Sequence, residues 1–449
     1  MRSTAIPTSR GPVLDPYLFY AGRFIRDAAR WLMAILAVIY LAHIGISTTQ
    51  IGIIFGASLV GGFLLSVAVM LTNQAISTRT WAIVNMLITG LAGIILITSD
   101  DLWLLIIGGF FGSYAASGAH WGGMTQLEQT GIAVVIPQEN RTKAYSILTI
   151  ASAAGRAAGA LLAGLSTFLI NTLDWGPILA YNTLLWLYVG LHILASLIYL
   201  FLSNPSHSPG AVDIRRGREA GLPSPKRPTS VGEMSEGQIP SPGQRERVRV
   251  RAHQPFLANP FKSRARRPIL TMSSLFAIDS FAGGMIFESF LSFWLFNKFG
   301  LSAAAIGAIL IAAQILNMLS LVLAPSVAKR LGLLNTLVFT QVVSNIALIL
   351  FAFAPTVIIA VALWLLRSLF DEMDVPTRQA YMMGITQPDE HPIMAGSANL
   401  GRGLGRIPSA TVTGWLWAGA LTATPWLLAG TLKLAYDLAI WLAFRRVKV

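Results

Sequence analysis

The sequence predicts an all-α polytopic membrane protein with twelve transmembrane helices in two six-helix bundles. The chain has 449 residues, of which 54% are hydrophobic and only 12% are charged. A soluble domain carries about 25% charged residues, so this composition suits a less polar solvent than water. Apolar runs close to the roughly 20 residues that cross a bilayer as a helix recur along the chain in two groups of six.

These two groups of spans define two predicted domains. The N-terminal six-helix bundle occupies residues 1–202, with spans at Leu18–Ala42, Thr49–Met70, Thr80–Thr98, Leu102–Gly123, Tyr145–Ile170 and Pro177–Leu202. The C-terminal six-helix bundle occupies residues 269–449, with spans at Ile269–Phe296, Ala303–Ala324, Leu333–Phe353, Thr356–Met373, Ala395–Ala418 and Pro425–Phe444. Residues 203–268 separate the two groups.

This central segment, residues 203–268, has a composition unlike that of the spans. It is rich in Pro, Ser, Gly and Arg and includes the stretches RRGREA and RERVRVR. Many charges with few large apolar residues favour disorder. We therefore expect a basic, disordered cytoplasmic linker. Binding of this segment to anionic lipid headgroups is the alternative, because basic clusters beside a membrane are attracted to them.

The net charge of +13 is distributed along the chain in a pattern typical of membrane topology. Basic residues fall at alternate helix ends or at the C-terminus: Arg79, Lys143, Lys329, Arg330, Arg445, Arg446 and Lys448. By the positive-inside rule, both termini are expected in the cytoplasm of a multi-pass protein of the plasma (cell inner) membrane. Topology explains the basicity, so we expect no binding to nucleic acid. The first apolar run is too long and too charged for a cleavable signal peptide.

Several chemistries are excluded by what the sequence lacks. It has no cysteine, which removes disulfides, thiol catalysis and thiolate metal sites. Its six histidines have no ligand spacing, so no metal site and no cofactor are expected. Twelve spans argue against a soluble enzyme, and we assign no catalytic residue. No nucleotide-binding loop is evident, so any energy coupling is expected to come from an ion gradient.

An internal repeat supports a duplicated fold. The segments AAGRAAGALLAG (Ala153–Gly164) and GLGRIPSATVTG (Gly403–Gly414) align 250 positions apart, which pairs Arg156 with Arg406. They lie in the fifth and eleventh spans, as a six-plus-six duplication requires. Parallel repeats related by an axis along the membrane normal are a known way to build a transporter.

Several stretches resemble a known family. The first and seventh spans, AGRFIRDAARWLMAILAVIYLAHIGISTTQIG and FAIDSFAGGMIFESFLSFWLFNKFGLSAAAIG, are similar to helices of the major facilitator superfamily. MDVPTRQAYMMGITQPDE followed by GSANLGRGLGR resembles the tenth-to-eleventh connection in a poorly characterised branch of that superfamily. The resemblance implies two bundles that rock about a central solute site, lined mainly by the first, fourth, seventh and tenth helices.

The chain departs from two superfamily motifs. LTNQAISTRT keeps a basic residue, Arg79, in the loop after the second span, but it lacks the usual acid. In APSVAKRLG, Lys329 stands where an acid is expected. The fifth span has GRAAGALLAG, with Ala160 in the place of the proline found in drug antiporters. These departures weaken the expectation of the usual gate salt bridge and of drug antiport.

The first span carries four charges in an otherwise apolar helix. At helical spacing, Arg23, Arg26, Asp27 and Arg30 fall within an arc of about 100° on one face. Asp27 is expected to pair with Arg23 and with Arg30. We assign Arg26, Asp27 and Arg30 to the substrate site. For Arg23 and Arg26, snorkelling to the cytoplasmic interface is the alternative.

The tenth span repeats this pattern. Arg367 and Asp371 share a face near mid-span and are assigned to the substrate site together with His120. Asp374 and Arg378 lie closer to the cytoplasmic end, and we assign them to the gate or domain interface with Glu128 and Arg141. Pro376 is expected to interrupt the helix between Asp374 and Arg378, because proline disfavours helix at the preceding residue.

Three more arginines lie on the fifth and eleventh spans, namely Arg156, Arg402 and Arg406. In the superfamily these helices run along the domain interface. The resemblance therefore implies that the three side chains pair with acids of the opposite bundle. Direct contact with the substrate is the alternative for each of them.

The seventh span holds two acids, Asp279 and Glu288, which are assigned to ion coupling. Nine residues apart, they point to opposite helix faces unless the helix breaks at Gly283-Gly284. A carboxyl group in a low-dielectric medium can bind and release a proton near neutral pH. One of the two is therefore expected to carry the proton, and Asp279 is favoured because it should lie nearer the charged stripe of the first span. In the last span, Lys433 and Asp437 are expected to neutralise each other.

These observations together predict a secondary active transporter that moves a small organic solute by alternating access, coupled to an ion gradient, with H⁺ as the expected ion. The buried arginines favour an organic anion. One alternative is a multidrug or cation efflux antiporter, with Glu288 in an aromatic cavity. Another is a non-transporting membrane sensor or assembly factor on the same fold. The expected partners are the solute, H⁺ and the lipid bilayer, and the protein is expected to be a monomer.

Overall fold

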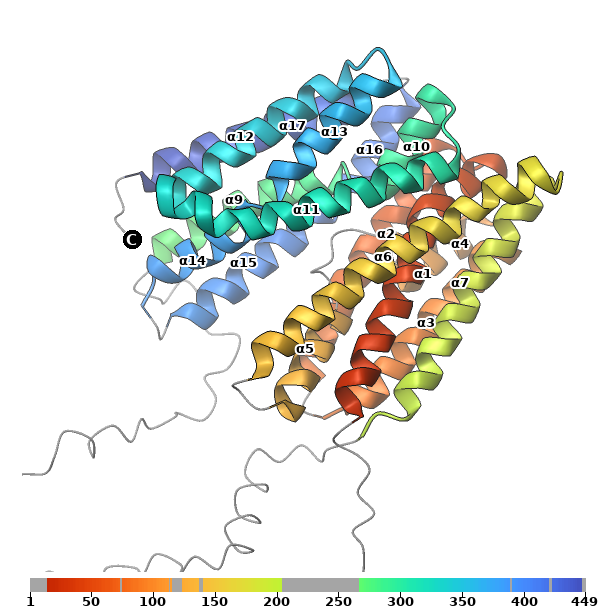
Figure 1. Ribbon diagram of the computed structural model, residues 1–449, viewed down its shortest axis with the longest axis horizontal. Coiled ribbons are helices and arrows are strands. Elements are labelled where there is room, and N and C mark those ends of the chain that lie inside the picture. Colours follow the sequence, from red (N-terminus) through yellow and green to blue (C-terminus); the bar gives the residue numbers. More distant parts are fainter. Residues whose placement is uncertain are drawn as a thin grey trace, which may run out of the picture. The chain divides into compact units, whose positions relative to one another are not determined.

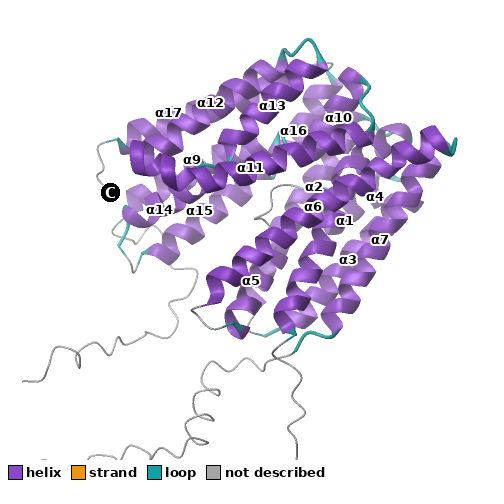
Figure 2. Ribbon diagram, viewed as in Figure 1, coloured by secondary structure: helices purple, strands orange, loops and turns teal. Residues whose placement is uncertain are grey.

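The computed structural model describes residues 14–72, 75–112, 114, 123–136, 140–203, 266–387, 390–419 and 422–445. These residues form helices joined by turns and short loops (Figure 1, Figure 2). Nearly all of the predicted linker 203–268 lies outside the described residues.

Within residues 1–202 the helices follow the six predicted spans. They are α1 (Asp15–His43), α2 (Thr48–Thr72), α3 (Thr78–Thr98), α4 (Leu102–Gly112), α5 (Gly123–Val135), α6 (Arg141–Thr172) and α7 (Pro177–Leu200). Within residues 269–449 and the turn before them, the helices are α9 (Arg266–Gly284), α10 (Glu288–Phe299), α11 (Ala303–Leu331), α12 (Leu333–Ala352), α13 (Val357–Asp371), α14 (Asp374–Gly384), α15 (His391–Arg406), α16 (Ser409–Ala418) and α17 (Thr424–Phe444).

The predicted all-α membrane fold is confirmed. Among the described residues, eight helical segments are long and apolar enough to cross a membrane. The other four predicted spans fall on α1, which carries the four charges, and on the pairs α4/α5, α13/α14 and α15/α16. Each of these pairs divides one predicted span or its continuation into two shorter helices. Neither helix of a pair is long enough on its own to cross a membrane, so a criterion of helix length does not detect these spans.

Two breaks depend on residues visible in the sequence. Between α9 and α10 the chain is non-helical from Met285 to Phe287, directly after the Gly283-Gly284 pair. Between α15 and α16 the break contains Pro408, which cannot donate a backbone N–H. The expected break at Pro376 does not occur, because α14 begins at Asp374 and the proline lies in its first turn, where no N–H is required.

In each bundle, helices that are far apart in the sequence pack against one another. In the N-terminal bundle α1 packs against α6 and α7, and α3 packs against α7 and α4. In the C-terminal bundle α9 packs against α15 and α17, and α12 packs against α17 and α13. Contacts between the bundles are made by α2 with α16, α6 with α11, and α1 with α10.

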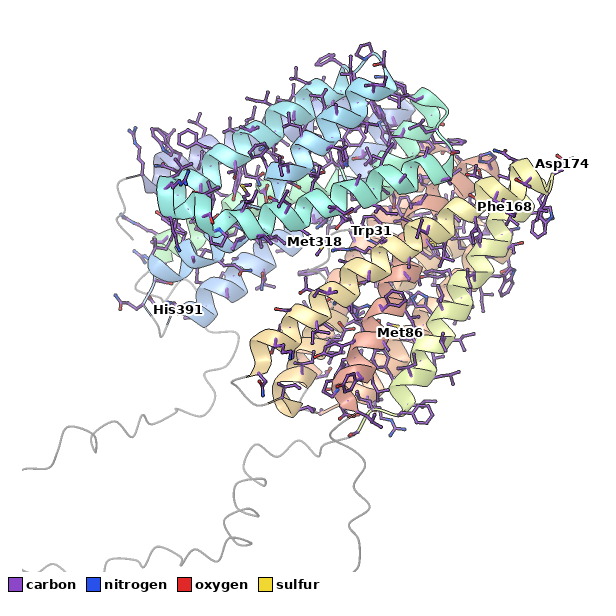
Figure 3. All side chains as sticks on the ribbon, viewed as in Figure 1. Trp31, Met86, Phe168, Asp174, Met318 and His391 are labelled. Carbon is purple, nitrogen blue, oxygen red and sulfur yellow. The ribbon has the colours of Figure 1, made fainter. Side chains whose placement is uncertain are left out.

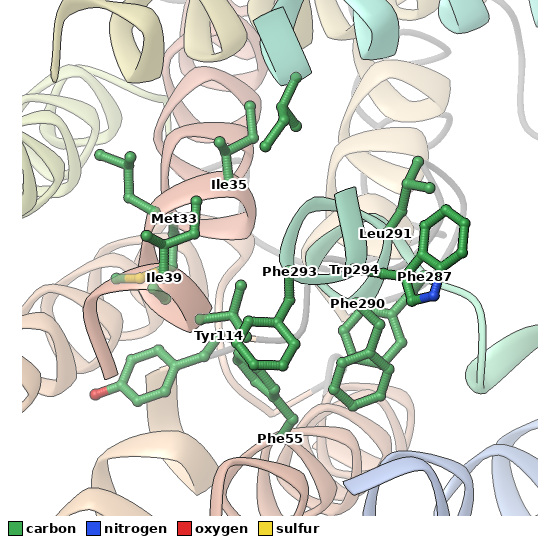
Figure 4. Packing of buried hydrophobic residues seen from close by; sticks show 14 of the residues in the cluster. Met33, Ile35, Ile39, Phe55, Tyr114, Phe287, Phe290, Leu291, Phe293 and Trp294 are labelled. Atoms are coloured by element: carbon green, nitrogen blue, oxygen red, sulfur yellow. The ribbon is translucent and has the colours of Figure 1, made fainter. Parts of the chain in front are cut away.

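The hydrophobic core is shared by the two bundles at one end only. One cluster joins residues of both bundles, and in it Phe55 of α2 lies 5.9 Å from Phe287 and 5.8 Å from Phe290 of α10 between ring centroids. Figure 4 shows Phe55, Phe287 and Phe290, of which Phe290 lies on α10 and Phe287 directly before it. At the other end, which holds the start of α1 and the end of α17, each bundle has a cluster of its own. The two bundles are therefore packed together at the end farther from the termini.

Candidate functional site

A buried ion-pair network joins α1 to α5 in the N-terminal bundle. Arg23 Nη1 lies 2.8 Å from Glu128 Oε2, and Arg23 Nε lies 2.9 Å from Asp27 Oδ2. Arg26 Nη1 lies 3.1 Å from Glu128 Oε1, and Arg30 Nη1 lies 3.5 Å from Asp27 Oδ1. Both predicted pairs of Asp27 are thus formed. Glu128, which is fully buried, binds the two arginines nearest the start of α1.

Neutral side chains complete this network. Ser152 Oγ of α6 donates a hydrogen bond to Asp27 Oδ2 at 2.5 Å, and Tyr199 Oη of α7 donates to Glu128 Oε1 at 3.1 Å. Arg23 and Arg26 are each only 4% exposed. They do not snorkel to an interface. Buried charges need such full pairing because leaving water costs several kcal/mol per ion.

A second network joins three helices of the C-terminal bundle. Lys433 Nζ of α17 lies 2.6 Å from Asp279 Oδ1 of α9. Arg378 Nη1 of α14 lies 2.5 Å from Asp374 Oδ2 and 4.0 Å from Asp279 Oδ2. Asp374 and Arg378 therefore share a helix face, as predicted for an unbroken helix.

The expectation that Lys433 and Asp437 neutralise each other is wrong. Lys433 instead extends past Gly283 of α9, which has no side chain to block it, and reaches Asp279. Asp437 is fully buried and accepts a hydrogen bond from Asn345 Nδ2 of α12 at 2.8 Å. The polar Asn345 in an apolar helix was the signal that could have identified this contact.

The other predicted pair on the tenth span is present. Arg367 Nη2 lies 2.9 Å from Asp371 Oδ2, and its guanidinium lies 4.9 Å from the Trp364 ring centroid. Gln341 Nε2 donates to the Asp371 carbonyl oxygen at 2.6 Å, and Ser344 Oγ donates to Asp371 Oδ1 at 3.3 Å. Arg367 is therefore fixed by residues of its own bundle.

Glu288 is a carboxylate on which arginines from both bundles act. It is the first residue of α10, directly after the break, and it interacts electrostatically with Arg406 of α15, Arg156 of α6 and Arg30 of α1. Among the described residues, no acid lies within ion-pair distance of Arg156 or Arg406. The site around Glu288, defined by these four residues, holds three arginines and one acid, and two further acids act on its arginines, Asp27 on Arg30 and Glu372 on Arg156.

The buried nitrogen atoms in this site are incompletely bonded. The Nε atoms of Arg30, Arg156 and Arg406 are buried without a hydrogen-bond partner among the described residues. The guanidinium of Arg156 lies 5.9 Å from the ring centroid of Trp31, which Figure 3 labels on α1. Buried polar groups normally have partners. Donors of this kind, on three helices, can bind a further acceptor.

The structure corrects the expected placement of the two acids of the seventh span. Asp279 was expected to lie nearer the charged stripe of α1, but its ion-pair partners are on α17 and α14. Glu288 is the acid that interacts with Arg30, because the break reorients α10 relative to α9. Sequence reasoning also missed Glu372, between α13 and α14, which interacts electrostatically with Arg156.

The remaining predicted site residues are placed as follows. Arg402 lies over the Phe276 ring of α9 at 4.4 Å within its own bundle. The expected pairing of Arg156 and Arg406 with acids across the interface is not formed at ion-pair distance among the described residues. His120 and the side chain of Arg141 lie outside the described residues. Within the described part of the chain, no three His, Asp or Glu side chains are grouped so as to hold a metal ion.

Sequence comparison assigns the family. The profile of the Major Facilitator Superfamily matches residues 19–410, from α1 to the start of α16, which is most of the chain. The chain belongs to this superfamily. An uncharacterized membrane protein of Saccharomyces cerevisiae, YJR124C, is 21% identical over 429 residues, which cover 95% of this chain and 93% of the yeast protein.

Solved structures of the superfamily share the fold. The nucleoside transporter NupG superposes with a TM-score of 0.68 at 14% identity, covering 96% of this chain and 99% of NupG. A D-xylose–proton symporter gives 0.65 at 12% identity, covering 95% and 96%. The human organic anion transporter MFSD10 (TETRAN) gives 0.55 at 14% identity, covering 97% and 100%. At these identities the likeness shows the fold alone.

Proposed function

We propose that this protein is a secondary active transporter that moves a small organic anion across the membrane by alternating access, coupled to protons. The superfamily fold supports transport, and solved relatives with this fold include a proton symporter and an organic anion transporter. The observation that carries the choice of an anion is that the Nε atoms of Arg30, Arg156 and Arg406 are buried without a hydrogen-bond partner among the described residues, on three arginines that all interact electrostatically with Glu288.

The chemistry of these side chains suits a carboxylate or another oxyanion. A guanidinium presents its N–H donors in a planar fork that binds two oxygens of one anionic group. Arg30 and Arg156 belong to the N-terminal bundle, whereas Arg406 and Glu288 belong to the C-terminal bundle. An anion bound among them bridges the two bundles. Its binding therefore depends on how the bundles are oriented, as alternating access requires.

Efflux of organic cations is less well supported. That function needs an acid without a nearby cation in an aromatic surrounding, for which Glu288 was the candidate. Aromatic side chains do adjoin it, since Phe287 precedes it and Phe290 follows it. However, the charges acting on Glu288 are three arginines. They would repel a cationic solute.

A ligand screen tests the proposal. Purified protein should be heated with a panel of mono- and dicarboxylates, phosphate esters, nucleosides, sugars and cationic drugs, because a ligand that binds only the folded state raises apparent stability. Organic anions should give the positive shifts, and Arg156→Ala or Arg406→Ala should abolish them. Arg267→Ala, at the exposed start of α9, is the matched control and should keep them. Shifts with cations or sugars only would contradict the proposal.

The same screen separates transport from a sensor or assembly role. A compound that stabilises the protein should next be offered, radiolabelled, to proteoliposomes. A transporter should accumulate or exchange it, whereas a sensor binds it without movement. We further propose that the protein lies in the plasma membrane as a monomer with both termini in the cytoplasm.

A further inference from the structure

Lys433, Asp279 and Asp437 form a charged group in the C-terminal bundle, in which Asp279 also interacts electrostatically with Arg406 of the site around Glu288. Lys433 Nζ lies 2.6 Å from Asp279 Oδ1, and Asp437 follows Lys433 by one helical turn on α17. The lysine side chain passes Gly283, where a Cβ atom would lie 4.0 Å from Lys433 Cε. The ammonium group is thus paired with a carboxylate of α9, and a second carboxylate stands one turn away on its own helix.

Asp437 has an unused acceptor. Its Oδ2 atom accepts the hydrogen bond from Asn345, whereas its Oδ1 atom is buried without a hydrogen-bond partner among the described residues. A buried polar atom without a partner costs about 1–3 kcal/mol. Because residues four apart share a helix face, Lys433 can reach Asp437 by side-chain rotation, with no movement of α17.

The other charged groups that face Lys433 and its two acids have partners of their own. They are the pair Arg378–Asp374 of α14, the pair Arg367–Asp371 of α13, and Arg402 of α15, which lies over Phe276. Arg406 of α15 interacts electrostatically with both Asp279 and Glu288, and Tyr436 of α17 is a further titratable neighbour. From α12 the group receives only the neutral amide of Asn345. Lys433 is therefore the cation best placed to serve both Asp279 and Asp437.

We propose that Asp279 binds the coupling proton and that Lys433 then moves from Asp279 to Asp437. This inference rests on the proposed function and names its coupling group. A proton from water forms an O–H bond at Asp279, the Lys433–Asp279 ion pair breaks, and the ammonium, still protonated, pairs with Asp437. The net charge of the three groups rises from −1 to 0. A link between α9 and α17 is replaced by one within α17, which frees the helix that leads to Glu288.

Infrared difference spectroscopy tests the proposal on the purified protein without solute, so its outcome does not depend on transport. Acidification should produce the C=O stretch of a protonated carboxyl group, and Asp279→Asn should remove that band. Asp100→Asn, an exposed acid between α3 and α4, is the control and should leave the band unchanged. If Asp279→Asn fails to fold, the double variant Asp279→Asn/Lys433→Met removes both charges and should lack the band.

The decisive variant is Asp437→Asn, which keeps the shape of the side chain and its contact with Asn345. Without Asp437 the freed ammonium has no second partner, so the midpoint of the titration should fall by about one pH unit. In a Lys433→Met background the same substitution should cause a smaller shift, because only the direct interaction between Asp437 and Asp279 then remains. A band that persists in Asp279→Asn, an unchanged midpoint in Asp437→Asn, or an equal shift in the Lys433→Met background would each overturn the proposal.

Discussion

Gly52 of α2 and Gly414 of α16 lie in backbone contact across the two bundles. A Cβ atom built on Gly414 would lie 2.7 Å from Gly52 Cα and 2.5 Å from the carbonyl oxygen of Thr48. Neither neighbour is a flexible side-chain end, so the close approach of α2 and α16 requires glycine at position 414. Small residues permit the same kind of approach between membrane helices in general.

Gly414→Val should keep the bundles apart at this end. Overpacking of a close contact costs about 1–3 kcal/mol, which is enough to shift an equilibrium between two conformations. A cysteine introduced at Ser289, buried on α10, should become reactive to a membrane-impermeant maleimide added from outside. The sequence has no cysteine of its own, so the labelling has no background.

Gly62→Val on α2 is the matched control. A Cβ atom at Gly62 meets nothing within 4 Å, so this substitution should leave the labelling of Ser289→Cys at the wild-type level. Equal labelling in the two valine variants would show that the Gly52–Gly414 contact does not determine closure.

Glu128→Gln should destabilise the protein strongly. The substitution leaves Arg23 and Arg26 buried with one acid instead of two, and removal of one partner from a buried ion pair costs about 3–5 kcal/mol. Denaturant unfolding in detergent should show the loss. Asp101→Asn, at an exposed helix start, should change stability by less than about 0.5 kcal/mol. Similar denaturant midpoints for Glu128→Gln and Asp101→Asn would show that the ion-pair network does not contribute to stability.

Arg30→Lys should impair binding of the solute found in the ligand screen. A lysine keeps the positive charge but cannot form a bidentate hydrogen-bonded contact with an oxyanion. A lost hydrogen bond to a charged group is worth about 1.5–3 kcal/mol, so affinity should fall by about ten- to a hundredfold. Arg30→Ala should abolish transport. Full transport by Arg30→Ala at equal expression would make the stripe on α1 structural only.

Topology can be tested with reporters. Alternate helix ends carry the basic residues, so a reporter fused after Val449 and another inserted near Ser241 should both be found in the cytoplasm. Alkaline phosphatase is active only outside the cytoplasm, whereas a fluorescent protein is fluorescent inside it. Each reporter, fused at the same site, therefore serves as a control for the other. An external location for either site would contradict the twelve-span arrangement.

Local patterns predicted the charged faces but not their distant partners. Asp27 pairs with Arg23 and Arg30 because all three lie on one face of one helix, which spacing alone reveals. Lys433 pairs with Asp279, which is 154 positions away, although an acid stands one turn from it. Spacing favours the local pair, whereas helix packing decides which side chains meet.

The helix breaks show the same limit. A break at Gly283-Gly284 was considered only as the exception to a continuous seventh span; the break is present, and the resulting turn of α10 lets Glu288 interact with Arg30. The span Ala395–Ala418 was expected to be continuous, yet α15 ends at Arg406 and α16 begins at Ser409. Pro408, which lies in the break, was the residue in the sequence that indicated it. The direction in which α10 turns depends on contacts with α1 and α2, which no local pattern contains.

The broken helices also have a mechanical consequence. A continuous rod transmits a tilt at one end to the other, whereas two short helices joined by a few residues can pivot at the joint. The segment Met285–Phe287 is such a joint, with the α9 charges on one side and the aromatic contacts of α10 on the other. A swing of α9 therefore need not separate Phe55 from Phe290. The contacts on the α9 side can open while the aromatic contacts on the α10 side stay closed. The path of the solute is then not open at both ends at the same time.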